Sequence, residues 1–346
     1  MKKRLLSICL VLALCLTCVP SALAVGDGRF SGGDGTENAP YEITTADDLF
    51  ALADAVNKKG MSYEDQYFRL TNDIDLGTDA NHPWTPIGNN AGTEGWQFLG
   101  TFDGNDRTVR GLYVEGAHGY AGLFGVVGML GRNTKAEVKN LNVVGSVSVE
   151  RTPANFYVAG IAGFVGDGAK ITNCSFEGTI TATIKSGQSG QGTSKTVLIG
   201  GIAGYNFGTI SECTVLNSDI SGKNQSTTAG GAVYVAGIVA ANNTGGTIKS
   251  CTVENSTITG TNENKASQNL VGGIAADNIV GTIEDCKVIN GSVSTSGSME
   301  VSSVGGIAGC SDGTLKDCSN SASVTGKNAF NLEEKEEVSL GSGGVV

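Results

Sequence analysis

One phrase recurs along the second half of the chain: Gly-Ile-Ala-Gly or a close variant, then a turn, then Ile-x-x-Cys-x-Val. Copies occupy residues 160–176, 201–215, 237–253 and 273–288, and a weaker copy covers residues 306–318. The copies lie 32 to 41 residues apart. Repetition at such a period indicates stacked structural units that each contact only their neighbours. The repeat therefore predicts an elongated solenoid, and it constrains shape far more than chemistry.

The aligned copies share one column that we expect to form a ladder in the core. An aliphatic residue lies three positions before this column, and Val or Phe lies two positions after it. The two-residue step keeps side chains on one strand face, whereas the three-residue step requires a bend. The predicted core ladder consists of Leu141, Cys174, Cys213, Cys251, Cys286 and Cys318.

A second column, four residues later, predicts tight turns. Its members are Gly or Asn, which tolerate a left-handed backbone at low cost. Ala322 breaks the pattern in the last copy, and an aliphatic residue two or three positions further on begins another strand. Each unit should therefore hold about three short strands, stacked in parallel about 4.8 Å from their copies. The predicted turn positions are Gly145, Gly178, Asn217, Asn255 and Asn290.

Length varies mainly at one point of the unit. The inserts at residues 185–196, 222–231 and 260–269 are rich in Ser, Gly, Thr, Asn and Gln, as solvated loops are. All three fall between the last strand of one unit and the first strand of the next. We expect them to emerge as loops along one side of the stack.

The chain begins with features of an export signal. Lys2, Lys3 and Arg4 precede an apolar run and an Ala-Leu-Ala site at residues 22–24, so residues 1–24 are predicted to be a signal peptide. No integral membrane segment is expected after its removal. The formal net charge of −11 then becomes −14, which argues against nucleic acid as a partner. Lipid attachment at Cys15 or Cys18 is disfavoured by the residues that precede them.

The segment before the repeats predicts a cap for the first coil. Thr45 and Asp48 resemble a capping box, and apolar residues follow at helical spacing until Gly60. We divide the rest of the chain into an N-terminal α/β cap at residues 25–113, the repeats at residues 114–326, and an acidic, Gly-rich tail at residues 327–346.

The order of several phrases resembles bacterial GLUG-motif proteins. These phrases are Leu-Thr-Asn-Asp-Ile-Asp-Leu at residues 70–76, Trp-Thr-Pro-Ile-Gly at residues 84–88 and Gly-Thr-Phe-Asp-Gly-Asn at residues 100–105, followed by Gly-Leu-Phe-Gly and Gly-Ile-Ala-Gly. The resemblance implies an all-β, right-handed parallel β-helix on an exported, often surface-associated protein. The same motif accompanies the catalytic domain of some immunoglobulin A peptidases. It implies a scaffold, and a fold is weak evidence for an activity.

The cysteine column has three interpretations. Buried thiols can pack as small hydrophobic groups. Some could form disulfides, although in-register parallel strands hold the Cβ atoms further apart than a relaxed bridge prefers. Zinc would need four converging ligands. Packing is favoured, and Cys310, outside the column at an expected turn, should be the exposed thiol.

Other candidate sites are also weighed against structural roles. His82 and His118 lie outside any His-Glu-x-x-His motif, which argues against a zinc peptidase. The charged group Asp103, Asp106, Arg107 and Arg110 could serve a lyase, but its sequence also suits a turn and its flanking strand.

Calcium binding and sugar stacking are the remaining candidates. Asp73, Asp75 and the Gly-rich residues 32–35 could bind calcium, but a loop role is favoured. A sugar-stacking platform of Trp84, Trp96, Phe98 and Tyr113 is less favoured than a core role.

We therefore expect a secreted or cell-surface, non-enzymatic scaffold. It would present its polar loops, in an adhesin-like manner, to a glycan or an extracellular protein. We assign no catalytic, cofactor-binding or metal-binding residue, and no cofactor. The alternative is a polysaccharide lyase or glycosidase on a β-helix.

Overall fold

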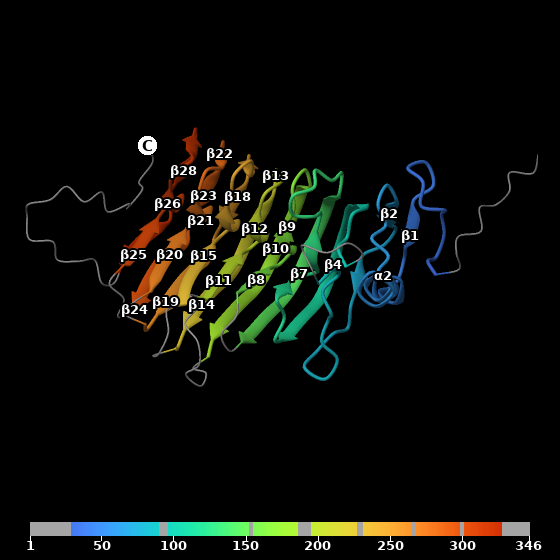
Figure 1. The fold of residues 1–346 in the computed structure, drawn as a ribbon, viewed down its shortest axis with the longest axis horizontal. Helices are drawn as coiled ribbons and strands as arrows, with labels where there is room; N and C mark the ends of the chain where they lie inside the picture. Colours follow the sequence, from blue (N-terminus) through green and yellow to red (C-terminus); the bar gives the residue numbers. More distant parts are fainter. Residues whose placement is uncertain are drawn as a thin grey trace, which may run out of the picture.

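The computed structural model describes residues 29–89, 96–151, 155–185, 195–226, 231–264, 267–297 and 301–326. The predicted signal peptide with Cys15 and Cys18, and the predicted tail, lie outside these residues. The chain winds into a parallel β-helix whose coils succeed one another along the long axis (Figure 1). The predicted all-β fold, with one helix near its N-terminal end, is confirmed.

Three parallel sheets form the walls of the helix. Sheet 1 contains seventeen strands: β1 (Tyr41–Ile43), β2 (Tyr67–Leu70), β3 (Ile74–Asp75), β4 (Thr101–Gly116), β7 (Glu137–Arg151), β10 (Lys170–Ile184), β13 (Thr209–Ser211), β14 (Thr214–Asn224), β17 (Thr247–Lys249), β18 (Thr252–Glu254), β19 (Thr257–Asn262), β22 (Thr282–Glu284), β23 (Lys287–Ile289), β24 (Ser292–Gly297), β27 (Thr314–Lys316), β28 (Ser319–Asn320) and β29 (Ser323–Gly326). Sheet 2 contains six: β5 (Tyr120–Ala121), β8 (Phe156–Ala159), β11 (Lys195–Gly200), β15 (Gly231–Ala236), β20 (Gln268–Gly272) and β25 (Val301–Gly305). Sheet 3 contains six: β6 (Phe124–Val127), β9 (Ala162–Val165), β12 (Ala203–Asn206), β16 (Val239–Asn242), β21 (Ala275–Asn278) and β26 (Ala308–Ser311).

The coil from β8 to β10 holds three strands, as expected, whereas the later coils hold more because their part of sheet 1 is divided into shorter strands. The coil from β15 to β19 shows the order: one strand in sheet 2, one in sheet 3 and three in sheet 1. The sequence hid the strand in sheet 3 because all four of its residues are buried. Both faces of that strand are covered, and the alternation that normally reveals a strand is absent.

Like side chains stack in register inside the helix. Ile171, Ile210, Ile248 and Ile283 are successive Cα partners along the axis. All four are fully buried and belong to one continuous apolar core that runs from Tyr41 to Ile307. The predicted ladder follows the same order, and Leu141 is the Cα partner of Cys174. The next three ladder residues, Cys213, Cys251 and Cys286, are also buried. Cys318 is partly exposed, because the coil it belongs to is the last one described.

The bend predicted between the Ile and Cys columns is a single left-handed residue. The residue immediately before each ladder position has a φ between 50° and 57°. Such a residue turns the chain sharply while the Cys side chain stays inward. Most are Asn or Asp, the non-glycine residues that pay least for this conformation. The set comprises Asn140, Asn173, Glu212, Ser250, Asp285 and Asp317.

The predicted turn column is left-handed in four of its five members. Asn217, Asn255 and Asn290 have φ values of 48°, 50° and 58°, and Gly178 has 145°. Gly145 is a correction, because it is not among the residues with positive φ. Glycine is required at this position because a side chain would not fit. A Cβ there would lie 2.2 Å from the Leu112 carbonyl oxygen.

The inserts connect sheet 1 of one coil to sheet 2 of the next. The loops are shorter than the predicted inserts, because the preceding strands extend into them. Strand β14 continues to Asn224 and strand β19 to Asn262, while β20 begins at Gln268. Residues 186–194, at the centre of the first insert, lie outside the described residues. The polar composition misled the prediction because these strand ends carry Gly, Thr and Asn rather than apolar residues.

Helix α2 (Ala46–Lys59) covers the N-terminal end of the core (Figure 1). The Thr45 side chain accepts a hydrogen bond from the Asp48 amide, and the Asp48 carboxylate accepts one from the Thr45 amide, as the predicted capping box requires. Gly60 ends the helix with a φ of 66°. Leu49, Leu52 and Val56 point into the same core as the strands. The division at residue 113 falls inside β4 and stays a prediction.

A buried asparagine ladder, not predicted from the sequence, supports the corner after sheet 3. The Nδ2 of Asn206 donates to Oδ1 of Asn242 at 2.8 Å, and Asn242 donates likewise to Asn278 at 2.9 Å. Each amide also donates to a backbone carbonyl of the following turn. All three residues are fully buried. Because the bonds link successive coils, the ladder ties the turns together at a position that Val165 occupies in the preceding coil.

We predict that Asn242→Ala lowers the free energy of unfolding by about 2 kcal/mol, because it leaves Oδ1 of buried Asn278 without its donor. The urea midpoint measured by circular dichroism should fall. Asn142→Ala is the matched control, since its half-exposed amide can exchange its partners for water. Equal midpoints for the two variants would show that the ladder adds no stability.

Candidate functional site

The cysteine column is a packing element with weak internal hydrogen bonds. All six cysteines in the described residues are free thiols. Each ladder thiol donates to the carbonyl two residues earlier, at 3.2 to 3.4 Å. Burial raises the pKa of the Cys213 and Cys251 thiols well above the ordinary value, and contact with the Cys251 thiol raises that of Cys286 to about 12. These thiols stay protonated at neutral pH, so they are poor nucleophiles and poor ligands.

The charged group around Asp103 serves local structure. The Asp103 carboxylate accepts hydrogen bonds from the Asn105 amide and from Nδ2 of Asn140, and it lies 3.6 Å from the Arg69 guanidinium. Arg110 lies 3.9 Å from the carboxylate of Asp75. Asp106 occupies a left-handed turn position. Asp103 and Arg110 are thus occupied by different partners, and this group does not form one convergent lyase-like centre.

The two aspartates proposed as calcium candidates also hold turns. Asp73 accepts a hydrogen bond from the Thr108 amide at 3.0 Å, and Asp75 accepts one from the Gly77 amide at 3.0 Å. In the Gly-rich segment, Asp34 accepts two bonds from Thr36. These interactions agree with the loop role favoured from the sequence.

The two histidines are far from any ligand set. His82 is exposed and lies 3.7 Å from Asp79, and the His118 ring bonds to the Glu115 carbonyl at 3.2 Å. Burial lowers the pKa of His118. His82 is thus a surface residue, whereas His118 is partly buried.

The four aromatic residues weighed as a sugar-stacking platform are divided between core and surface. Trp84 and Phe98 are buried, and the indole nitrogen of Trp84 donates to the Leu123 carbonyl at 2.9 Å. Trp96 is 37% exposed, and Tyr113 bonds through its hydroxyl to Glu115. The four residues therefore do not share one exposed face, and the core role holds for the two that are buried.

A second aromatic cluster, on the outer faces of sheets 2 and 3, was missed from the sequence. Its rings pack on one another although they come from two different sheets. The outer faces of sheets 2 and 3 therefore form a concave corner, which the rings fill. We call this cluster the outer strip, formed by Tyr120, Tyr157, Phe164, Tyr205, Phe207 and Tyr234. The sequence signal was the large residue three positions before four of the five Gly-Ile-Ala-Gly phrases, as in Tyr157 and Tyr234.

The outer strip is poorly suited to stacking on sugars. Tyr157 lies between Tyr120 and Tyr205, with ring centroids 5.2 and 5.6 Å away and interplanar angles of 13° and 10°. The edge of Phe164 contacts all three rings. A sugar needs an open ring face, and both faces of Tyr157 are covered by protein. The strip therefore stabilises the angle between the two sheets.

The same surface becomes polar toward the C-terminal coils. Asp277 occupies the position of Tyr205 two coils later, and Cys310 follows it in the next coil. Burial, and then the charge of Asp312, raises the pKa of Asp277 to about 6. Burial, and then the charge of Asp277, raises the pKa of the Tyr234 hydroxyl to about 12. Cys310 is exposed, as predicted, but it lies in strand β26 rather than in a turn.

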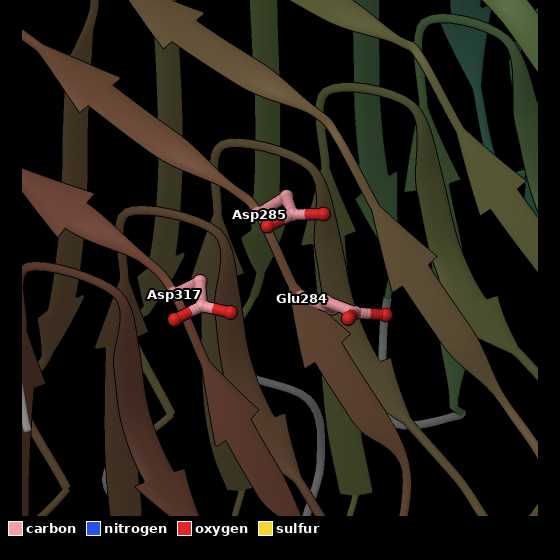
Figure 2. A group of neighbouring side chains, drawn as sticks. All are labelled: Glu284, Asp285 and Asp317. Atoms are coloured by element: carbon pink, nitrogen blue, oxygen red, sulfur yellow. The ribbon is translucent and has the colours of Figure 1, made fainter.

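Three carboxylates lie close together at the end of the ladder: Glu284, Asp285 and Asp317 (Figure 2). One oxygen of each lies within 4.8 Å of the others. However, Glu284 already bonds to Lys316 at 2.6 Å and to Lys249 at 3.1 Å. Those contacts lower the pKa of Glu284. The two lysines offset the charge of Glu284, and Asp285 and Asp317 are the left-handed residues that precede the ladder positions.

The best-formed hollow lies on the outer face of sheet 1 near its N-terminal end. It has a volume of about 460 Å³, within the range of small-molecule sites. Its floor is the first outward column of four paired strands, Tyr67, Thr101, Glu137 and Lys170. A smaller hollow of about 100 Å³ adjoins it and shares Tyr67 and Thr101. This hollow was not predicted from the sequence, because its walls come from five different coils.

We predict that Asp277→Asn stabilises the protein at pH 7 by about 1 kcal/mol, allowing for water at this half-buried site. The folded protein holds the Asp277 proton up to about pH 6, whereas the unfolded chain loses it near pH 4. Wild-type stability should therefore decrease between these values as the pH rises. Thermal unfolding should show the gain at pH 7 and none below pH 4, and the exposed Asp219→Asn is the matched control.

We predict that iodoacetamide at pH 8 labels Cys310 in the folded protein and labels Cys213, Cys251 and Cys286 only in denaturant. The reason is the exposure of Cys310 and the raised pKa of the buried thiols. Mass spectrometry of peptides measures the labelling of each site. Equal rates for Cys251 and Cys310 would contradict the buried ladder.

The comparisons with known proteins agree with this geometry. Residues 154–181 match the GLUG motif family. A protein of Evansella cellulosilytica described as a Gly-rich membrane protein is 38% identical over 130 residues, which is 36% of this chain and 13% of that protein. Halomucin of Haloquadratum walsbyi is 32% identical over 125 residues, which is 34% of this chain and 1% of that protein. The chain thus spans a small part of these relatives.

A solved structure shares the fold. A protein of Bacteroides ovatus described as an immunoglobulin A1 protease has a TM-score of 0.55 and 23% identity, over 86% of this chain and 80% of that one. Within the described residues, no helix is long and apolar enough to cross a membrane. The predicted resemblance to GLUG-motif repeat proteins is thereby confirmed, and the chain carries that motif on a parallel β-helix.

Proposed function

We propose that the protein is an exported, non-enzymatic scaffold of the cell surface, which holds its outer surface toward a glycan or an extracellular protein in an adhesin-like manner. One observation carries the proposal: the interior is filled by a continuous apolar core from Tyr41 to Ile307. A filled solenoid can interact with a partner only through its outside. The stacked coils also give a rod, which suits a module that extends from a surface.

The chemistry of the outside supports binding over turnover. Asp103 and Arg110, which could have served a lyase, are held by separate structural partners. The named relatives, a membrane protein and a halomucin, are consistent with a surface setting. A scaffold role also agrees with the GLUG motif, which is a repeat unit rather than a catalytic signature.

The test uses the protein purified after export, with a glycan array, a panel of extracellular proteins, and lyase and hydrolase assays on pectin, alginate and host glycans. We expect saturable binding to at least one array or panel member, lost on thermal unfolding, with no polysaccharide cleaved. Turnover of any substrate that Asp103→Ala abolishes would establish the alternative, a carbohydrate-active enzyme. Binding to no member of either panel would also contradict the proposal.

A further inference from the structure

The charges that line the 460 Å³ hollow are balanced but not paired with one another. Glu37, Asp65, Lys135 and Lys170 all line it and all are exposed. Within the described part of the chain, none of these four has an oppositely charged partner within 4.0 Å. The remaining pair is different, because Lys139 lies 3.1 Å from Glu137 on the floor and neutralises it. Two free acids and two free bases therefore face the same space.

The free charges are separated along the axis of the solenoid. Asp65 and Lys135 each precede the floor column by two residues, and their floor residues, Tyr67 and Glu137, are two coils apart. Two coil steps correspond to roughly 10 Å. Glu37 precedes Asp65 along the chain, and Lys170 lies one coil beyond Glu137. The hollow is thus acidic at its N-terminal end and basic at the other.

The backbone segments that carry these charges are held by neighbouring turns. The turn that carries Lys135 is tied to the next coil, since the Thr134 amide donates to the Asp167 carbonyl at 2.9 Å. At Gly168, a Cβ would lie 2.0 Å from the Asn133 side chain, so the two turns are in close contact. At the acidic end, the Asp34 carboxylate holds Thr36 beside Glu37, and Asp65 sits in a left-handed turn. Fixed walls reduce the entropy that a ligand must offset.

We propose that this hollow binds a zwitterionic glycan unit, in which one sugar carries a free amine and its neighbour carries a carboxylate. Lys135 and Lys170 would bind the carboxylate, and Glu37 and Asp65 would bind the ammonium group. A ligand with one charge would leave the opposite end of the hollow unpaired. Thr101 and Asn133 offer hydroxyl and amide groups for the sugar hydroxyls, and the half-buried Tyr67 offers an apolar ring. The inference rests on the proposed binding function and names its ligand class.

The test compares three oligosaccharides of equal length by calorimetry with the exported protein at low salt. They are hyaluronan fragments freed of N-acetyl groups, so that glucuronate alternates with glucosamine, ordinary hyaluronan fragments, which carry carboxylates alone, and chitosan fragments, which carry ammonium groups alone. We expect the first to bind about tenfold more tightly than either of the others, because each end contributes charge-assisted hydrogen bonds. Equal affinity for the three probes would overturn the inference.

Variants separate the two ends of the hollow. Lys135→Gln with Lys170→Gln should bring the affinity for the zwitterion down to that for chitosan, and Glu37→Gln with Asp65→Asn should bring it down to that for hyaluronan. Lys287→Gln, an exposed lysine on a distant coil, is the matched control and should change nothing. If the zwitterion binds but neither pair of substitutions weakens it, this assignment is wrong while the broader binding function stands. Displacement by a dipeptide at the same concentration would make this a peptide site and would also refute it.

Discussion

The whole structure depends on the register of parallel strand pairing between successive coils. The Cα partners Ile171, Ile210 and Ile248 lie in successive coils. Each side chain in such a column therefore packs against the equivalent side chain of the coil before it and of the coil after it. Apolar groups meet this condition by packing. Polar groups meet it only if they can donate to and accept from an identical neighbour. The amides of Asn206, Asn242 and Asn278 can do both, and this is why asparagine suits a buried polar column of the wall.

The register can be predicted from the sequence where equivalent positions of the repeats carry the same type of residue. It is harder to predict where the backbone conformation and the side-chain packing both restrict the residue at one position. The Cys and Ile columns were readable because both the chemistry and the spacing repeat. The spacing also predicted a bend between them, but not its left-handed residue, because Asn173, Glu212 and Ser250 share a backbone conformation without sharing a side-chain type. Gly145 shows the reverse case: a glycine that matched the turn column is required for close approach to Leu112. Column identity alone does not separate these two reasons for glycine.

The surface sites were less predictable than the core, for a related reason. Core neighbours occupy equivalent positions in successive repeats, so an alignment of the repeats brings them together. The hollow at the N-terminal end is built partly from Glu37 and Asp65, which precede the repeats, and from Lys135, which lies in the turn between β6 and β7. The outer strip was missed because it depends on the angle between sheets 2 and 3. That angle is set by side chains that pack on both faces of strands such as β9, whose four residues are all buried.

These observations explain how a repeat scaffold can acquire a specific site. Uniform columns make successive coils alike, so a regular stretch offers a ligand the same groups many times and fixes none of its positions. A distinct site requires a place where the repetition is broken and the backbone still holds rigid. The first coils meet both conditions: their turns differ from one another, yet Tyr67, Thr101 and Glu137 keep the strand register beneath them. Selectivity in such a fold is therefore expected where the repeat begins, on a floor set by its regular part.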